Sequence, residues 1–323
     1  MLGVLLGLAL GAALAFLWEA LDTRLRSADD IADRLGLPLL ARLPEPPRKL
    51  RSREELVMLR EPHGVQAEAF RVLRTNLEFA RLGRQARTIM ITSAVEQEGK
   101  STTVANLAVA LARDGKRVVL VDLDLRRPYI ARFFGIEDAW GLTHVALGRV
   151  TLDEAMTRMS IETRPTAQRP KRLADEAEAV RSNGGGGGGG HGALHVLGSG
   201  PIPPNPGEFV GTRELEAALA HLREQSDVVL IDAPPLLHVG DALTLSAKVD
   251  GLILVTRLGV VRKGMLDEVH RLLEAAPAEK LGFIVTDAEV EKGYGHGYGY
   301  GGAYYGRVSR RMEADVAASE VPM

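Results

Sequence analysis

The sequence contains no cysteine among its 323 residues. Disulfides, iron–sulfur clusters and zinc sites with thiolate ligands are therefore excluded. The eight histidines are scattered and form no H-E-x-x-H pair, so a histidine-based zinc site is not expected. Charge of one sign is also lacking, with 40 Lys+Arg against 42 Asp+Glu. This balance argues against a protein that coats nucleic acid.

Residues 1–18 lack any charged side chain. A helix of eighteen residues spans about 27 Å at 1.5 Å per residue, close to the roughly 30 Å hydrocarbon core of a bilayer. A signal peptide would need a basic start and a cleavage site with small residues, whereas the first charge here, Glu19, follows the run. We expect one transmembrane helix over 1–18, followed by a juxtamembrane connector over 19–60.

Glycine and tyrosine are distributed unevenly. Seven of the 35 glycines form the run Gly184–Gly190, and five of the six tyrosines lie between Tyr294 and Tyr305. Polar and glycine-rich composition is typical of segments that bury no core. We therefore predict a flexible insertion over 160–192 and a disordered Gly/Tyr tail over 288–323.

The remaining residues, 61–287, alternate between short apolar runs and amphipathic stretches. Continuous Val/Ile/Leu strands that alternate with helices predict an α/β fold, with a mainly parallel sheet and helices on both faces. The predicted strands are Thr88–Thr92, Arg117–Asp122, Leu194–Leu197, Val228–Asp232, Leu252–Thr256 and Leu281–Val285. The predicted helices include Glu68–Ala80, Ser101–Arg113, Arg213–Glu224 and Met265–Ala275.

The first of these strands runs directly into A-x-x-x-x-G-K-S, residues 94–101, and then into a helix. This is the relaxed pattern of a phosphate-binding loop, in which backbone N–H groups surround phosphate oxygens at a helix N-terminus. Lys100 would place its charge on the β- and γ-phosphates, and the Ser101 hydroxyl would bind Mg²⁺. A chance strand–turn–helix is the competing interpretation. A dinucleotide-binding fold is excluded, because no G-x-G-x-x-G follows this strand.

Acidic residues follow two later strands, Asp122 and Asp124 after one and Asp232 after the other. The carboxyl ends of parallel strands line the ligand crevice. Carboxylates there, beside a phosphate loop, are expected to hold metal or water or to act as a general base. Taken singly, each aspartate is as well explained as a helix cap or turn former.

Three motifs together resemble a known family. They are E-G-K-S-T-T-V-A-N-L-A (98–108), V-D-L-D-L-R-R-P (121–128) and L-I-D-A-P-P (230–235). In this order they resemble the bacterial tyrosine kinases, the cytoplasmic domains of polysaccharide co-polymerases, which are related to phosphate-loop ATPases of septum placement and chromosome partition. The resemblance extends over about residues 1–305, and P-P-N-P-G-E (203–208) also fits it.

The resemblance implies roles for individual residues. ATP would be bound by Ala94, Gln97, Glu98, Gly99, Lys100, Ser101, Thr102 and Asp232, and Mg²⁺ by Ser101, Asp122 and Asp232. Lys100, Asp122 and Asp124 would be catalytic, and one of the two aspartates would orient or deprotonate the acceptor tyrosine. The loop carries Glu96-Gln97 where the family usually has Pro-Gly, and Thr286 where it usually has an asparagine that reads adenine.

The resemblance also implies self-association and self-modification. Glu68, Arg71 and Arg74 match the motif by which one subunit of a ring docks on its neighbour, and their spacing places them on one helical stripe. An ordinary solvated helix face is the simpler interpretation without the resemblance. The expected phosphate acceptors are the tail tyrosines, which interleaved glycine keeps within reach of a neighbouring site: Tyr294, Tyr298, Tyr300, Tyr304 and Tyr305.

The function expected from sequence is a membrane-anchored, autophosphorylating protein-tyrosine kinase that regulates exopolysaccharide or capsular polysaccharide biosynthesis and export. It would use ATP and Mg²⁺ and lie in the inner (plasma) membrane, with its kinase domain cytoplasmic. Its partners would be further copies of itself in a ring, membrane proteins of polysaccharide chain-length control and export, and a tyrosine phosphatase, with no nucleic acid. The altered loop motivates an alternative, an ATP-binding assembly switch without kinase activity. A partition-type ATPase is a weaker alternative.

Overall fold

The computed structural model describes residues 25–288 except 26, 52–53 and 162–191, together with scattered positions among residues 3–14. Within this part of the chain one sheet of eight strands has the order β1-β8-β7-β2-β6-β3-β5-β4. All neighbouring strands are parallel except β4 and β5, which are antiparallel. The strands are β1 (Leu39–Leu43), β2 (Thr88–Ser93), β3 (Arg117–Asp122), β4 (Thr157–Met159), β5 (Ala193–Leu197), β6 (Val228–Asp232), β7 (Gly251–Arg257) and β8 (Glu279–Thr286).

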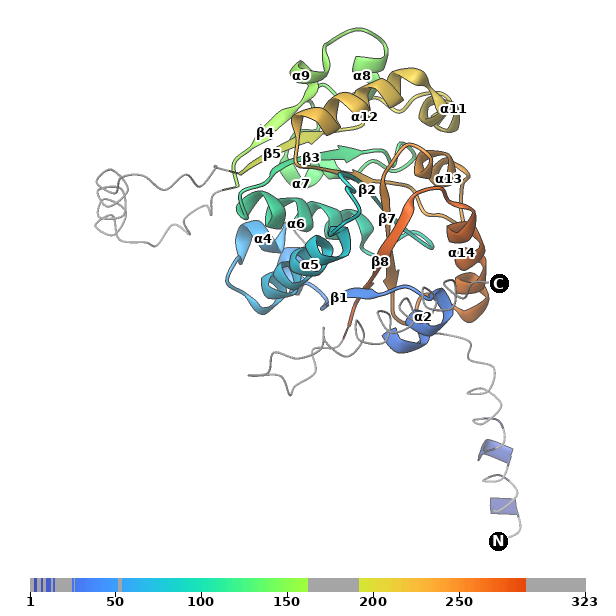
Figure 1. Ribbon diagram of the computed structural model, residues 1–323. Coiled ribbons are helices and arrows are strands. Elements are labelled where there is room, and N and C mark those ends of the chain that lie inside the picture. Colours follow the sequence, from blue (N-terminus) through green and yellow to red (C-terminus); the bar gives the residue numbers. More distant parts are fainter. Residues whose placement is uncertain are drawn as a thin grey trace, which may run out of the picture. The chain divides into compact units, whose positions relative to one another are not determined.

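Helices cover both faces of this sheet (Figure 1). On one face lie α2 (Ala28–Leu35), α12 (Arg213–Gln225), α13 (Asp241–Ser246) and α14 (Lys263–Ala275). On the other lie α3 (Arg48–Arg51), α4 (Val57–Arg60), α5 (Val65–Arg81) and α6 (Lys100–Arg113). Three shorter helices pack with the first of these layers, α8 (Leu142–Ala146), α9 (Leu152–Ala155) and α11 (Pro206–Gly211), and α7 (Ile130–Phe134) packs with the second. The predicted α/β fold, a mainly parallel sheet between two helical layers, is confirmed.

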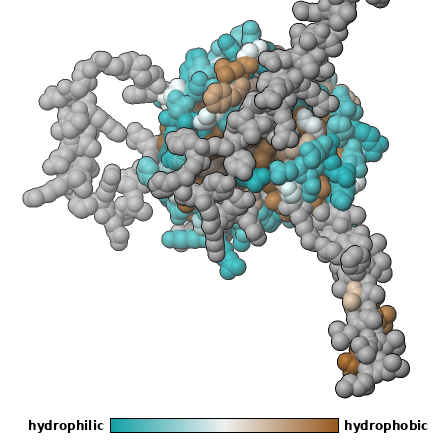
Figure 2. Space-filling view, turned by 60° about the horizontal axis from the view of Figure 1, so that its bottom comes forward, coloured by the Kyte–Doolittle hydropathy of each residue, from teal (hydrophilic) through white to brown (hydrophobic). Residues whose placement is uncertain are grey.

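The core consists of two apolar clusters separated by the sheet. Side chains alternate between the two faces of a strand, so Ile89 and Ile91 of β2 pack with α5 and α6, while Met90 packs on the opposite side. All six residues of β2 are buried, as expected for a central strand of a parallel sheet. In Figure 2 most of the coloured surface is hydrophilic, with smaller hydrophobic areas between.

The six predicted strands are all present, but β1 and β4 were missed. β1 lies at the edge of the sheet and pairs with β8, from Leu39 opposite Phe283 to Leu43 opposite Thr286. Its partner is more than two hundred residues away along the chain, so no local pattern indicates the pairing. β4 has three residues and pairs with only one neighbour, β5.

Residues 28–60, which the sequence assigns to a connector, contribute α2, β1, α3 and α4 to the same unit as the sheet. Ser27 caps α2, since its hydroxyl accepts a hydrogen bond from the Asp29 N–H at 3.1 Å. The helix ends at Gly36, in the left-handed region at φ 63°. The boundary of the connector stays a prediction.

No helix among the described residues is long and apolar enough to cross a membrane. The span predicted over 1–18 falls largely on positions outside the described residues. So do most of the predicted insertion, residues 162–191, and the tail from residue 289 onward.

Candidate functional site

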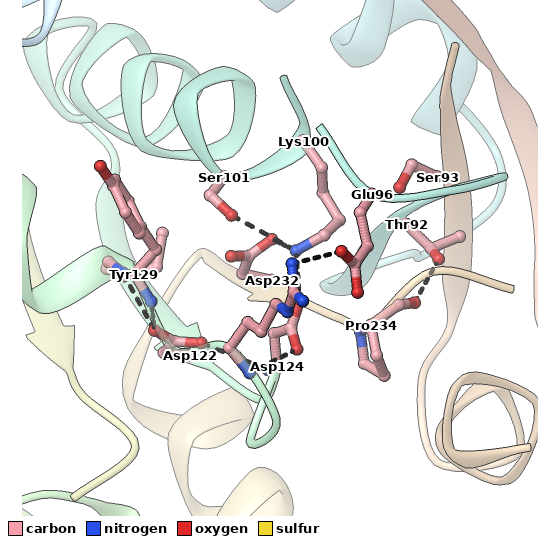
Figure 3. Close-up of polar contacts among 12 residues, drawn as sticks. Thr92, Ser93, Glu96, Lys100, Ser101, Asp122, Asp124, Tyr129, Asp232 and Pro234 are labelled. Atoms are coloured by element: carbon pink, nitrogen blue, oxygen red, sulfur yellow. Dashed lines mark hydrogen bonds and ion pairs between the residues drawn. The ribbon is translucent and has the colours of Figure 1, made fainter. Parts of the chain in front are cut away.

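The sheet brings the three sequence motifs together at one edge. β6 lies between β2 and β3, and its last residue, Asp232, is opposite Ile91 of β2 and Asp122 of β3. All three strands are parallel, so their carboxyl ends and the loops that follow lie side by side. Figure 3 shows the side chains of Ser101 and Asp232 directed toward Lys100, while Asp122 is directed toward Tyr129.

The loop between β2 and α6 ends in a helix N-terminus without a side-chain cap. Gly99 is the N-cap residue, at φ 83°, and no side chain accepts a hydrogen bond from the N–H groups of the first turn. Glycine adopts this left-handed conformation without a steric penalty. Uncapped N–H groups and the positive end of the helix dipole favour an anion such as phosphate.

Lys100, the first residue of α6, lies in a cluster of carboxylates. Its ammonium is 2.5 Å from Asp232 Oδ1 and 3.2 Å from Asp124 Oδ2, and it donates a hydrogen bond to the Ser101 hydroxyl at 3.3 Å. The side chain is 7% exposed. Burial opposes the charge, but the two carboxylates outweigh it and raise the pKa of Lys100 above its ordinary value. The ammonium is therefore charged, ready to contact an anion.

Asp232 is fully buried at the end of β6 and keeps one oxygen free. Oδ1 contacts Lys100, whereas Oδ2 is buried with no hydrogen-bond partner among the described residues. Burial raises the pKa of Asp232, although the Lys100 charge opposes this shift. A buried carboxylate oxygen without a partner is costly, which indicates a place for a further ligand, such as a metal ion or water.

Asp122 and Asp124 have different surroundings. Both oxygens of Asp122 accept hydrogen bonds from backbone N–H groups, Oδ1 from Asp124 at 3.2 Å and Oδ2 from Tyr129 at 2.9 Å and Ile130 at 3.0 Å. Burial and then the Asp232 charge raise the pKa of Asp122 to about 7. Asp124 accepts one such bond, from Arg127 N–H to Oδ1 at 3.2 Å. Asp122 thus holds the backbone of the loop that follows β3, whereas the second oxygen of Asp124 contacts Lys100.

Glu98, predicted as a nucleotide-binding residue, places its carboxylate inside the protein. Its two oxygens accept hydrogen bonds from the N–H groups of Val95 at 2.8 Å and Arg257 at 3.0 Å. Its own carbonyl accepts one from the Thr286 hydroxyl at 2.8 Å. Glu98 and Thr286 therefore tie the loop to the ends of β7 and β8. This use of Thr286 could not be read from the sequence, because its partner Glu98 lies 188 residues away along the chain.

Burial raises the pKa of Glu98 from its ordinary 4.5 to about 7. A raised pKa means that the native state holds this proton more tightly than the unfolded chain does, so stability is lost as pH rises from 4.5 to 7. The size of the shift corresponds to about 3 kcal/mol of unfolding free energy. We expect the wild-type protein to lose this much more stability than Glu98→Gln over that interval, in urea unfolding at each pH.

Asp122 titrates in the same range in both proteins, so the difference between them isolates Glu98. Parallel pH profiles for the two proteins would contradict the assignment of the raised pKa to this residue.

Gln97 has a strained backbone. Its φ is 62°, a left-handed conformation that costs a residue with a Cβ about 1 kcal/mol. We expect Gln97→Gly to raise the unfolding free energy by about 0.5 kcal/mol or more, since relief of strain exceeds the added entropy of the unfolded chain. Thermal unfolding measures this change. Gln66→Gly, at the second residue of α5, is the control, because glycine relieves no left-handed strain there; it is expected to lower stability, by less than about 1 kcal/mol.

Glu96 does not place its charge against the phosphate-binding turn. Its carboxylate pairs with the Arg127 guanidinium and lies 3.6 Å from the imidazole of His238. The ion pair joins the phosphate loop to the loop after β3 (Figure 3). The extra negative charge that the sequence places in this loop is thus compensated by a cation.

The other predicted loop residues surround the same site. Ala94 is buried, and its carbonyl accepts the Leu237 N–H at 3.2 Å. Gln97, Gly99 and Thr102 line a cavity of about 320 Å³ beside the loop. Its walls come from residues before β2 as well as from the loop and the end of β8, among them Leu43, Pro44, Leu50, Phe70, Tyr129, Phe133, Arg257 and Thr286. The sequence did not indicate Tyr129, Arg257 or the N-terminal residues.

The predicted ring motif lies on α5, and none of its three residues lines this cavity. Arg71 pairs with Glu68 and also donates to the Pro62 carbonyl, while Arg74 pairs with Asp114 at 2.9 Å. These three side chains are partly exposed. The five predicted acceptor tyrosines lie outside the described residues.

Comparison with known proteins agrees with this geometry. Residues 89–297 match the family model of the CobQ/CobB/MinD/ParA nucleotide-binding domain. The tyrosine-protein kinase YwqD of Bacillus subtilis is 34% identical over 76% of this chain and 91% of its own length. The chain belongs to the bacterial tyrosine kinases.

Two further similarities support this membership. The tyrosine-protein kinase ptk of Acinetobacter johnsonii is 26% identical over 89% of this chain. The chain spans most of YwqD but only 36% of ptk. Among solved structures, the chimerical protein CapA2B2 has a TM-score of 0.67 at 28% identity, covering 82% of this chain and all of the other.

Proposed function

We propose that this chain is a membrane-anchored, ATP- and Mg²⁺-dependent kinase that phosphorylates the tyrosines of its own tail and so regulates exopolysaccharide or capsular polysaccharide biosynthesis and export. One observation carries the proposal. A charged Lys100, contacting Asp232 and Asp124, stands at the uncapped N-terminus of α6 in a chain that belongs to the bacterial tyrosine kinases.

The residues present fit a nucleotide. The N–H groups at the start of α6 and the Lys100 ammonium suit phosphate oxygens. The cavity of about 320 Å³ beside the loop has the size of a small-molecule pocket. Leu43, Leu50 and Phe70 in its wall suit a base, and Thr286, which is held by the Glu98 carbonyl, stands where the family usually has its adenine-reading asparagine. We therefore place the nucleoside in this cavity.

The residues present also fit Mg²⁺. The free Oδ2 of Asp232 and the Ser101 hydroxyl are hard oxygen ligands of the kind this ion prefers. No group of three or more His, Cys, Asp or Glu side chains suited to a metal occurs in the described part of the chain, so phosphate oxygens and water would complete the shell. A bound Mg²⁺ would neutralise charge on the transferred phosphoryl group. Asp122, with both oxygens engaged, would act by holding the loop.

Phosphoryl transfer then needs a base for the tyrosine, whose hydroxyl has an ordinary pKa near 10. Asp124 would take the hydroxyl proton while the phenolic oxygen forms a bond to the γ-phosphorus and the bond to the β,γ-bridging oxygen breaks. Lys100 would leave its carboxylates to neutralise the phosphates. Catalysis would come mainly from positioning and from charge neutralisation.

Assembly into a ring would bring a tail to a neighbouring site. Beside Glu68, Arg71 and Arg74, α5 exposes an apolar stripe of Val65, Val72 and Phe79, which are 67%, 47% and 58% exposed. Residues seven apart share one face of a helix, and an exposed apolar stripe favours contact with another protein. Membrane proteins of polysaccharide export and a phosphatase would be further partners. The uncharged run over 1–18 would anchor the chain in the plasma membrane, with its kinase domain cytoplasmic.

The test is autophosphorylation of the purified full chain. With ATP and Mg²⁺ we expect phosphotyrosine, located by mass spectrometry between Tyr294 and Tyr305. Changing the five tail tyrosines to phenylalanine is expected to remove the signal while leaving ATP binding intact. Tight ATP binding without phosphotyrosine, also after addition of the membrane partner, would favour the alternative, an ATP-binding assembly switch.

A further inference from the structure

A second cavity, of about 370 Å³, lies between α4, α5 and α6. It shares no lining residue with the cavity beside the phosphate loop. Arg113, the last residue of α6, lines it, whereas Lys100 is the first residue of that helix. At 1.5 Å per residue, these two positions are about 20 Å apart along the helix axis. A ligand in the second cavity would therefore not occupy the proposed nucleotide site.

The lining of this cavity is basic. Its lining consists of three arginines and a histidine, Arg71, Arg74, Arg113 and His63, together with Met58, Pro62 and Ala110. No carboxylate is among these lining residues. Glu68 and Asp114 pair with Arg71 and Arg74. Within the described residues Arg113 has no ion-pair partner.

Arg113 has an unused donor. Its Nε donates a hydrogen bond to the Ile161 carbonyl at 2.9 Å, but Nη2 is buried without a partner in the part of the chain that the structure describes. Burial, and then the neighbouring charge of Arg71, lower the pKa of Arg113. Both observations indicate positive charge without compensation. An unpaired buried donor is costly, and a guanidinium cannot give up its charge to escape that cost.

An oxyanion in the cavity would supply the missing acceptors. Guanidinium groups bind phosphate through two parallel N–H donors, and such charge-assisted bonds are stronger than neutral ones. The negative end of the α6 dipole opposes an anion at this place, so the attraction has to come from the arginines. Three guanidinium groups against two carboxylates leave one positive charge for the ligand.

We propose that this cavity, lined by Arg71, Arg74 and Arg113, is a second anion site that binds a phosphoryl group. The group has two sources of the same chemistry, free inorganic phosphate or a phosphorylated tyrosine of a tail. The second source rests on the proposed kinase function, whereas the first does not. Arg71 and Arg74 of the predicted ring motif would then also be phosphate ligands. Docking of one subunit on its neighbour would therefore depend on whether a phosphoryl group is bound in this cavity.

The test is calorimetric titration of the full chain with inorganic phosphate and, separately, with phenyl phosphate. We expect Arg113→Gln to weaken one binding event at least about tenfold, because a charge-assisted bond is lost. Arg113→Lys, which keeps the charge, is expected to weaken it less. Arg149→Gln, an exposed arginine elsewhere, is the matched control and should bind as the wild-type protein does. Lys100→Met is expected to weaken phosphate binding at the phosphate loop only. Comparison of Lys100→Met with Arg113→Gln therefore distinguishes binding at the loop from binding in the second cavity.

Phenyl phosphate binding more tightly than inorganic phosphate would assign the site to phosphotyrosine, and equal binding would assign it to free phosphate. Unchanged phosphate affinity in Arg113→Gln would overturn the proposal, as would a lower melting temperature as its sole effect. A chain that forms no phosphotyrosine would overturn the kinase function but would leave the phosphate titration of Arg113→Gln to decide this site.

Discussion

Lys100→Met is expected to abolish detectable ATP binding and, with it, all phosphotyrosine. In the described part of the chain, the Lys100 ammonium is the only basic group that forms an ion pair with Asp232 or Asp124. Without it, the phosphates would face two carboxylates with no compensating charge from this helix. We expect a loss of nucleotide affinity of at least about a hundredfold, as for a charged contact of about 3 kcal/mol. Calorimetry with Mg²⁺·ATP measures it.

The same change is expected to destabilise the fold. Asp232 is fully buried, and removing one partner of a buried ion pair costs about 3 kcal/mol. Because burial already raises the pKa of Asp232, this carboxyl can take up a proton, which limits the cost at low pH. The stability of Lys100→Met should therefore recover as the pH falls, in denaturant unfolding at several pH values.

The double variant Lys100→Met/Asp232→Asn separates the two effects. A neutral amide needs no cation, so we expect most of the lost stability to return while ATP binding stays absent. Recovery of ATP binding in the double variant would show that Lys100 serves only to neutralise Asp232, and would contradict its assignment as a phosphate ligand.

The local patterns of this sequence were sufficient for the central fold and for the phosphate loop. Val228–Asp232 and Thr88–Thr92 are continuous apolar runs that end in loop motifs, and a parallel sheet has only one edge at which such ends meet. The meeting of Lys100, Asp124 and Asp232 follows from that rule. The rule does not predict which of Asp122 and Asp124 accepts hydrogen bonds from which backbone N–H groups, because these bonds depend on the path of the backbone after β3.

Contacts between segments far apart in the sequence could not be predicted. Thr286 supports the Glu98 carbonyl, and the residues around Leu43 and Leu50 wall the proposed nucleotide cavity, but neither has a local signal in the sequence. The left-handed φ of Gln97 is imposed by the loop against the preference of its residue type. Such disagreement between local preference and structure is common at functional sites.

Asp124→Asn is expected to abolish most kinase activity while ATP binding is retained. Asp122→Asn is expected mainly to lower the stability of the fold. Among the described residues, Asp124 has one oxygen that no backbone N–H occupies and that contacts only the Lys100 ammonium, at 3.2 Å. Once Lys100 turns to the phosphates, this oxygen would be available to accept the tyrosine proton. Loss of a general base lowers the rate by about a hundredfold to ten-thousandfold. Single-turnover formation of phosphotyrosine at saturating ATP measures this rate.

Asp122→Asn replaces one acceptor oxygen by an amide that faces N–H donors of Asp124 or of Tyr129 and Ile130. We expect a loss of about 1–3 kcal/mol in unfolding free energy, the cost of an unpaired buried donor, and a smaller loss of rate than in Asp124→Asn. The opposite ranking, with Asp122→Asn nearly inactive yet fully stable, would make Asp122 the base. In that case its pKa, raised to about 7, should appear as a rise of the wild-type rate through neutral pH, because only the ionised carboxylate can accept the tyrosine proton.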